Sequence, residues 1–199
     1  MTAEPACQTP TAAILSWWGW LQLDIGESRA AAARLRRCTS VFDALLLSET
    51  HQLIKMVRRS GERRLAYDAD QRLAVLAIAL AHIKNTSAIP FAAALGRTID
   101  GRPPNTKVGE RPRLSPARFG ALLRTADARN WDGFARALRR SVAILGDTTF
   151  YVPGLIGDVL HMGDKTLQHW TYRYWQTNAP GEFDSPSTPP TNNSNGVVQ

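Results

Sequence analysis

The sequence predicts an all-α protein of two small helical bundles joined by a linker, followed by a disordered C-terminal tail. Apolar residues recur every three or four positions along almost every periodic segment, as on one face of a helix, and no segment alternates like a confident strand. Between residues 97 and 112 this periodicity gives way to turn-forming residues. The predicted parts are a bundle over 1–96, a linker over 97–112, a four-helix bundle over 113–178 and a tail over 179–199.

The first bundle is expected to contain a tryptophan-rich helix, an alanine-rich helix and three further helical segments. A hydroxyl at Thr39 or Ser40 suits the N-cap of the third helix, because such an oxygen accepts a hydrogen bond from a free backbone N–H. Asp68 is expected to cap the fourth helix in the same way. The expected helices cover residues 11–23, 26–38, 41–59, 68–84 and 91–96.

The second bundle is expected to begin at Ser115, an N-cap followed by Pro116 at the first helical position, where proline has no N–H to leave unsatisfied. A second helix ends at Gly146. Further helices are expected over 152–162 and 164–177. The tail after them is rich in Pro, Ser, Thr and Asn, a composition too polar to bury a core.

Basic residues exceed acidic residues, and most of them are arginines. The chain has 24 Lys and Arg residues against 17 Asp and Glu residues, and a formal net charge of +7. The tail contributes Glu182 and Asp184 but no basic residue, so the positive charge is concentrated in the folded part. Guanidinium groups favour planar, bidentate partners, so this bias indicates a phosphate-bearing partner, although a GC-rich gene would also raise the arginine content.

The arginines gather on the polar faces of two predicted helices, over 26–38 and over 130–145. Few acids accompany them on these helices, Glu27 and Asp132 being the nearest. We therefore expect one continuous outward strip of unpaired guanidinium groups that binds nucleic acid. The candidate nucleic-acid-binding residues are Arg29, Arg34, Arg36, Arg37, Arg58, Arg59, Arg111, Arg113, Arg118, Arg136, Arg139 and Arg140.

Six tryptophans offer rings on which nucleobases stack, as in proteins that bind single strands. Trp131 and Trp170 lie on apolar stripes and are expected in the core. For Trp18 and Trp175, the core and a protein interface remain open alternatives. Base-specific reading therefore has little support in the sequence.

No catalytic residue, metal site or cofactor is expected. The four histidines are scattered, and His161 with Asp158 and Asp164 is the nearest approach to an acid–base cluster. Cys7 and Cys38 are the only cysteines, and they support neither a disulfide framework nor a zinc site.

We also expect a cytoplasmic protein with no membrane role. The longest apolar run, over 73–81, is much shorter than the roughly 18 residues that suggest a membrane span. The first basic residue is Arg29, so the N-terminus lacks the cationic region of a signal peptide.

Four stretches form a distinctive combination: RAAAARLRR at 29–37, RPRLSPARFGALL at 111–123, ALRRSVAIL at 137–145 and HMGDKTLQHWTYRYW at 161–175. Together they closely resemble the CasB family, the small subunit of the type I-E CRISPR surveillance complex, Cascade. The resemblance extends over 14–175 and is most specific in the RPR-LSP-RF run and the LRR triplet. Met162 is a departure, because the family usually has tryptophan in that turn.

The resemblance implies an all-helical protein of two bundles that acts in antiviral defence without catalysis. Copies of the family pair head to tail within the ribonucleoprotein complex, beside the large subunit, the backbone subunits and the hybrid of crRNA and target DNA. Their basic residues hold the displaced non-target strand and so stabilise the R-loop. The residues that match the family's paired arginines and its RPR-LSP-R run are Arg36, Arg37, Arg139, Arg140, Arg111, Arg113 and Arg118.

Two other functions remain open from the residues alone. A free-standing helical DNA-binding regulator would use residues 39–59 as a helix-turn-helix and would discriminate between duplex sequences. A helical phosphohydrolase would use His161, Asp158 and Asp164 and would depend on a metal ion.

Overall fold

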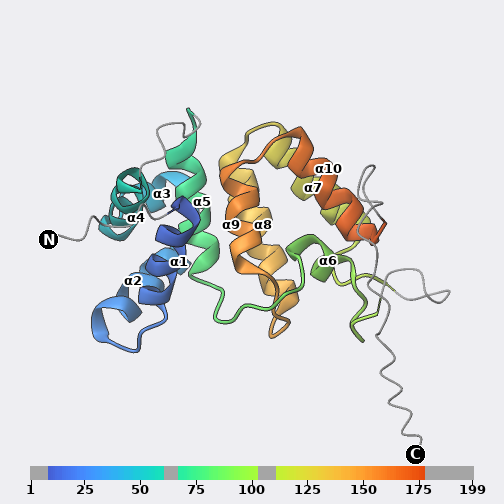
Figure 1. Cartoon of the computed structure of the whole chain (residues 1–199), viewed down its shortest axis with the longest axis horizontal. Coiled ribbons are helices and arrows are strands. Elements are labelled where there is room, and N and C mark those ends of the chain that lie inside the picture. Colours follow the sequence, from blue (N-terminus) through green and yellow to red (C-terminus); the bar gives the residue numbers. More distant parts are fainter. Residues whose placement is uncertain (1–8, 61–66, 103–110, 178–199) are drawn as a thin grey trace, which may run out of the picture.

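The described part of the chain is all-α, as predicted. The computed structural model describes residues 9–60, 67–102 and 111–177, and within them it contains ten α-helices and no strand, with one isolated antiparallel bridge between Thr98 and Pro112 (Figure 1). The predicted tail, residues 103–110 of the predicted linker and Cys7 lie outside these residues. The helices are α1 (Pro10–Leu21), α2 (Gly26–Arg37), α3 (Val41–Leu45), α4 (Ser48–Arg59), α5 (Ala69–Leu80), α6 (Phe91–Gly96), α7 (Pro116–Asp127), α8 (Trp131–Leu145), α9 (Val152–Leu160) and α10 (Asp164–Trp175).

The expected single helix over 41–59 is wrong, because the chain breaks it into α3 and α4. Leu47 has an extended backbone, with φ −89° and ψ 135°, and interrupts the helical hydrogen bonds. A continuous helix would bring Lys55 onto the face that Val41 buries, since the two residues are about four turns apart. The break changes the phase of the helix, so Val41 is buried and Lys55 remains exposed.

Two of the three predicted N-caps are confirmed. The Ser40 hydroxyl accepts from the backbone N–H of Asp43 in a capping box, and the Ser115 hydroxyl accepts from the N–H of Arg118, with Pro116 in the first turn. Asp68 does precede α5, but its carboxylate makes no cap hydrogen bond. That carboxylate instead accepts from the side chain of Arg72.

The core runs through the whole molecule, with α1 to α5 on one side, α6, α7 and α10 on the other, and α8 and α9 between them (Figure 1). α5 is the central element, because it packs against α3, α4, α8 and α9 and is buried along almost its whole length. α6 packs against α10, and one hydrophobic cluster includes Ala13 of α1 and Tyr174 of α10.

The two ends of the predicted linker lie side by side. Arg113 N–H donates to the carbonyl of Arg97 at 2.8 Å, and Leu114 N–H donates to the carbonyl of Leu95 at 3.1 Å. The chain therefore leaves α6 and returns toward α7 at the same place. The division into two domains stays a prediction.

Arg72 joins three helices inside the core. Its Nε donates to Asp68 Oδ1 at 2.8 Å, and its Nη1 donates to the carbonyl of Leu160, at the end of α9, at 2.8 Å. Its guanidinium also lies 5.1 Å from the ring centroid of Trp131 in α8. The buried guanidinium of Arg72 therefore has all these partners inside the fold and is not available to a ligand.

α6 and α10 approach each other so closely that only glycine fits at the contact. A Cβ on Gly96 would lie 1.9 Å from the carbonyl oxygen of Tyr174. The Tyr174 hydroxyl donates to the carbonyl of Leu114 at 2.6 Å, and its ring stacks on Phe119 with 4.0 Å between centroids. These contacts fix the last turn of α10 beside the start of α7.

The tryptophans serve mainly the core. Trp170 is buried, as predicted, and Trp131 is half-buried against the core. Trp18 is also buried, and its Nε1 donates to the carbonyl of Ile83 at 3.0 Å. Trp175, at 39% exposed, is the one of these four that presents much of its ring to solvent.

Candidate nucleic-acid interface

α2 presents four arginines on its exposed side, because its other side buries alanines and Leu35. Arg34, Arg36 and Arg37 lie in its last turn, where the helix dipole favours positive charge. The partners of these side chains decide which of them remain available for an anion.

Two arginines of α2 are paired with carboxylates, so the prediction that they are unpaired is wrong. Arg29 Nη1 lies 3.3 Å from Asp24 Oδ1, and Arg34 Nε lies 2.7 Å from Glu49 Oε1. Burial would raise the pKa of Glu49, but hydrogen bonds from Arg34 and other donors outweigh burial and lower this pKa. Glu49 therefore stays ionised and neutralises Arg34.

Arg58 of α4 is paired as well. Its Nη2 donates to the two carboxylate oxygens of Asp70 at 3.1 and 2.8 Å. In each of the three pairs the acid lies outside the helix that carries the arginine. A helical projection shows only the acids of the same helix, so the prediction that Arg29, Arg34 and Arg58 are unpaired is wrong.

Arg36 and Arg139 come together from two distant helices. Arg36 Nε donates to the carbonyl of Ala81 at 2.6 Å, and Arg139 Nη1 donates to the carbonyl of Cys38 at 3.0 Å. Arg139 thus reaches the end of α2, two residues after Arg36. Burial, and then the charges of Arg139 and Arg36, lower the pKa of His82. The two accepting residues, Ala81 and Cys38, are the C-cap residues of α5 and α2, and cations are favoured at such helix ends. A carbonyl holds a guanidinium in place without cancelling its charge.

Arg118 and Arg140 form a second group, because both line one groove between α7 and α8. Both side chains are exposed, and neither has a hydrogen-bond or ionic partner among the described residues. Since Arg139 and Arg140 are neighbours on α8, their side chains point about 100° apart, one toward α2 and one toward α7. α8 thus joins the two groups.

The remaining candidates also lack a carboxylate partner within the described part of the chain. Arg113 Nη2 donates to the carbonyl of Ile99 at 2.7 Å. The side chains without any partner among the described residues are those of Arg37, Arg59, Arg111, Arg118, Arg136 and Arg140. That they form one continuous strip stays a prediction.

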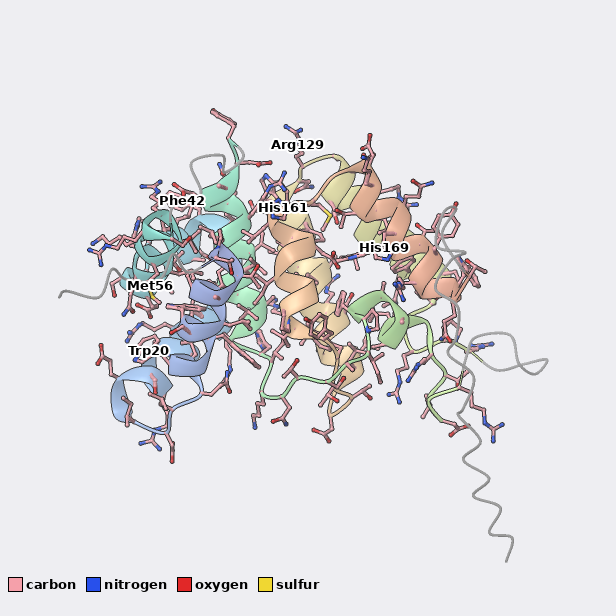
Figure 2. The ribbon with its side chains drawn as sticks, viewed as in Figure 1. Trp20, Phe42, Met56, Arg129, His161 and His169 are labelled. Carbon is pink, nitrogen blue, oxygen red and sulfur yellow. The ribbon has the colours of Figure 1, made fainter. Side chains whose placement is uncertain are left out.

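Sequence reasoning passed over two further exposed arginines, Arg124 and Arg129, at the end of α7. Arg129 has a positive φ of 51°, and its side chain points outward at the same end of the molecule as His161 (Figure 2). Their only signal was the run RTADARN, in which Asp127 obscured the basic character.

The His161 cluster shows no metal-site geometry. Asp158 Oδ2 accepts from Trp170 Nε1 at 2.7 Å, and burial raises the pKa of Asp158. In residues 9–60, 67–102 and 111–177, no group of three His, Cys, Asp or Glu side chains is placed to hold a metal ion. Cys38 is a buried free thiol. None of the described helices combines the length and apolarity that a membrane span requires.

A family model described as CRISPR-associated protein Cse2 matches residues 31–175, from α2 to the end of α10. The chain belongs to the Cse2 family. This family is CasB, so the predicted resemblance is confirmed, and the protein is a type I-E Cascade subunit of CRISPR defence. Cse2 proteins are structural subunits of Cascade and are not known as enzymes. Comparisons with curated proteins and with solved structures found no match. Of the candidate arginines, Arg29 alone precedes the Cse2 match.

Proposed function

We propose that this Cse2 protein binds the sugar-phosphate backbone of nucleic acid and, within Cascade, holds the displaced non-target strand and stabilises the R-loop. The observation that carries the proposal is the convergence of Arg36 and Arg139, whose acceptors are carbonyls rather than carboxylates. Arg118, Arg136 and Arg140, on α7 and α8, have no carboxylate partner among the described residues and add further positive charge.

The binding needs no chemistry and no base reading. Guanidinium groups that contact phosphates release condensed counterions, which supplies affinity that depends on salt but not on sequence. Selection of the target is left to base pairing with the guide RNA. A strand retained in this way is less able to re-form the duplex.

The partners of the proposal are the other Cascade subunits, including the large and backbone subunits, a second copy of the chain, crRNA and target DNA. The broken helix over 41–59 supports one alternative, because α3 and α4 are joined by a tight turn as in a helix-turn-helix. A free-standing regulator of that kind would prefer one duplex sequence over another, whereas backbone binding is equal for all sequences.

The salt dependence of binding tests the proposal. We expect the double variant Arg37→Ala/Arg136→Ala to weaken binding of the full chain to two unrelated single-stranded oligonucleotides equally. The log-log salt slope should flatten by about 0.7 for each lost phosphate contact. Fluorescence anisotropy over a range of salt concentrations measures both quantities.

Arg58→Ala is the matched control, because Arg58 is also exposed but is already paired with Asp70. It should leave the slope unchanged. An unchanged slope in the double variant, or a strong preference between the two oligonucleotides, would contradict backbone binding.

A further inference from the structure

The α7–α8 groove is mainly apolar, and small residues form much of its lining. Its volume is about 560 Å³, and its lining residues are Leu114, Arg118, Ala121, Ala137, Arg140, Ser141, Ala143 and Ile144. Three alanines leave space that larger side chains would fill. The Ser141 hydroxyl already donates to the carbonyl of Ala137 at 2.9 Å, so the groove wall has few free polar groups.

Two positive charges flank this apolar space. Arg118 comes from the first turn of α7 and Arg140 from α8, and both lack a partner among the described residues. An occupant that matches the groove therefore has an apolar side chain of aromatic size between two negative groups.

The sequence beyond α10 contains such a segment. Within residues 179–199, the single aromatic residue is Phe183, and the only two charged residues, Glu182 and Asp184, are its immediate neighbours. We call residues 182–184 the acidic tail segment.

The chain leaves α10 next to the groove. The Tyr174 hydroxyl donates to the carbonyl of Leu114, which lines the groove. Phe183 follows Thr177, the last described residue, by six positions, a length of chain that spans up to about 20 Å. The segment can therefore reach the groove of its own chain.

We infer that the acidic tail segment binds the α7–α8 groove of the same chain, with the Phe183 ring among the alanines and its flanking carboxylates on Arg118 and Arg140. Between the two arginines the groove wall offers alanines and few free polar groups, so a phenyl ring suits it better than the polar edges of a nucleobase. If the arginines also contact nucleic acid, which rests on the proposed function, the docked segment competes with the strand for them.

Photo-crosslinking of the full chain tests this inference without nucleic acid. Phe183 is replaced by p-benzoylphenylalanine, the dilute protein is irradiated, and crosslinked peptides are identified by mass spectrometry. We expect crosslinks within one chain to residues 114–144, with a yield that does not depend on protein concentration. The same probe at Val197, in the tail but outside the acidic segment, should give a yield about tenfold lower, because it lacks the paired charges.

Charge reversal provides the decisive control. Arg118→Glu/Arg140→Glu should reduce the crosslink yield about tenfold, and adding Glu182→Arg/Asp184→Arg should restore it. Ala121→Leu fills the groove from an exposed position of α7 and should have the same effect as charge reversal without changing the charge.

Crosslinks elsewhere, crosslinks only between chains, or a yield that charge reversal leaves unchanged would overturn the inference. So would crosslinking of the groove to 5-iodouracil-labelled single-stranded DNA in the absence of any tail crosslink. A normal tail crosslink together with an unaltered salt slope in Arg37→Ala/Arg136→Ala would instead contradict only the proposed function.

Discussion

All the ion pairs among the described residues lie in the first half of the molecule, whereas the described arginines of α7 and α8 form none. In α2, α4 and α5, ion pairs join Arg34 to Glu49, Arg58 to Asp70 and Arg72 to Asp68. In α7 and α8, Arg118, Arg136 and Arg140 have no partner among the described residues, and Arg139 contacts a carbonyl. Arginine content alone therefore does not locate a binding surface.

The difference indicates two uses of the same side chain. Where a carboxylate accompanies it, an arginine stabilises the fold and contributes little net field. Where carbonyls or solvent surround it, the charge extends outward and attracts an anion. Arg36 of α2 and Arg139 of α8 combine the two uses, because hydrogen bonds to carbonyls hold their side chains in place and leave their charges uncancelled.

The largest effect is expected from Arg72→Met, which removes the most buried member of the paired group. Arg72 and Asp68 are 5% and 7% exposed, so the variant leaves a buried carboxylate without its cation. Loss of one partner of a buried pair costs about 3–5 kcal/mol in the free energy of unfolding. Chemical denaturation measures this loss.

Arg136→Met on the exposed face of α8 is its control and should change the free energy of unfolding by less than about 0.5 kcal/mol. Similar losses in the two variants would remove the distinction between structural and available arginines.

An intermediate, pH-dependent effect is expected from Arg34→Ala. The carboxylate of Glu49, 3% exposed, would lose its cation, which costs about 1–3 kcal/mol near neutral pH. In the native protein the pKa of Glu49 is lowered, so the stabilisation is present above the ordinary glutamate pKa and is lost as pH falls through the lowered value.

In the variant, burial without the Arg34 hydrogen bond raises the pKa of Glu49, and protonation relieves the unpaired charge. The stability difference between the two proteins should therefore shrink as pH falls. Urea denaturation at several pH values measures it, and a difference that is constant with pH would show that Glu49 does not depend on Arg34 for its charge.

The smallest effect is expected from Asp70→Asn, which releases an exposed arginine from its pair. Arg58 would then resemble the available arginines, and the salt slope of single-strand binding would steepen by at most about 0.7. Anisotropy titrations compare it with Asp70→Glu, which keeps the charge. A steeper slope in both variants would show that the change in slope does not come from the release of Arg58.

The all-α class and most helix positions were predictable, because helical periodicity and caps such as Ser115 with Pro116 are local signals. The break at Leu47 was not, since it depends on which residues meet the core on each side of it. The role of Asp68 was also misjudged, because its partner Arg72 is needed inside the core between α5 and α9.

The sequence predicts that the candidate site consists of exposed arginines. It does not predict which of these arginines are neutralised by carboxylates. A helical projection places Arg34 on the outer face correctly, yet it contains no information about Glu49, which reaches it from α4. Likewise, nothing local relates Arg36 to Arg139, which share the surroundings of His82 only after α2, α5 and α8 have packed.

Gly96 has a consequence beyond its own contact. The Tyr174 carbonyl occupies the volume of a methyl group at that position, so the absence of one carbon atom sets how deeply the end of α10 is seated. Any side chain there would push this end outward, away from Leu114 and Phe119. The position of the C-terminal end of α10 thus depends on the absence of a side chain at Gly96 of α6.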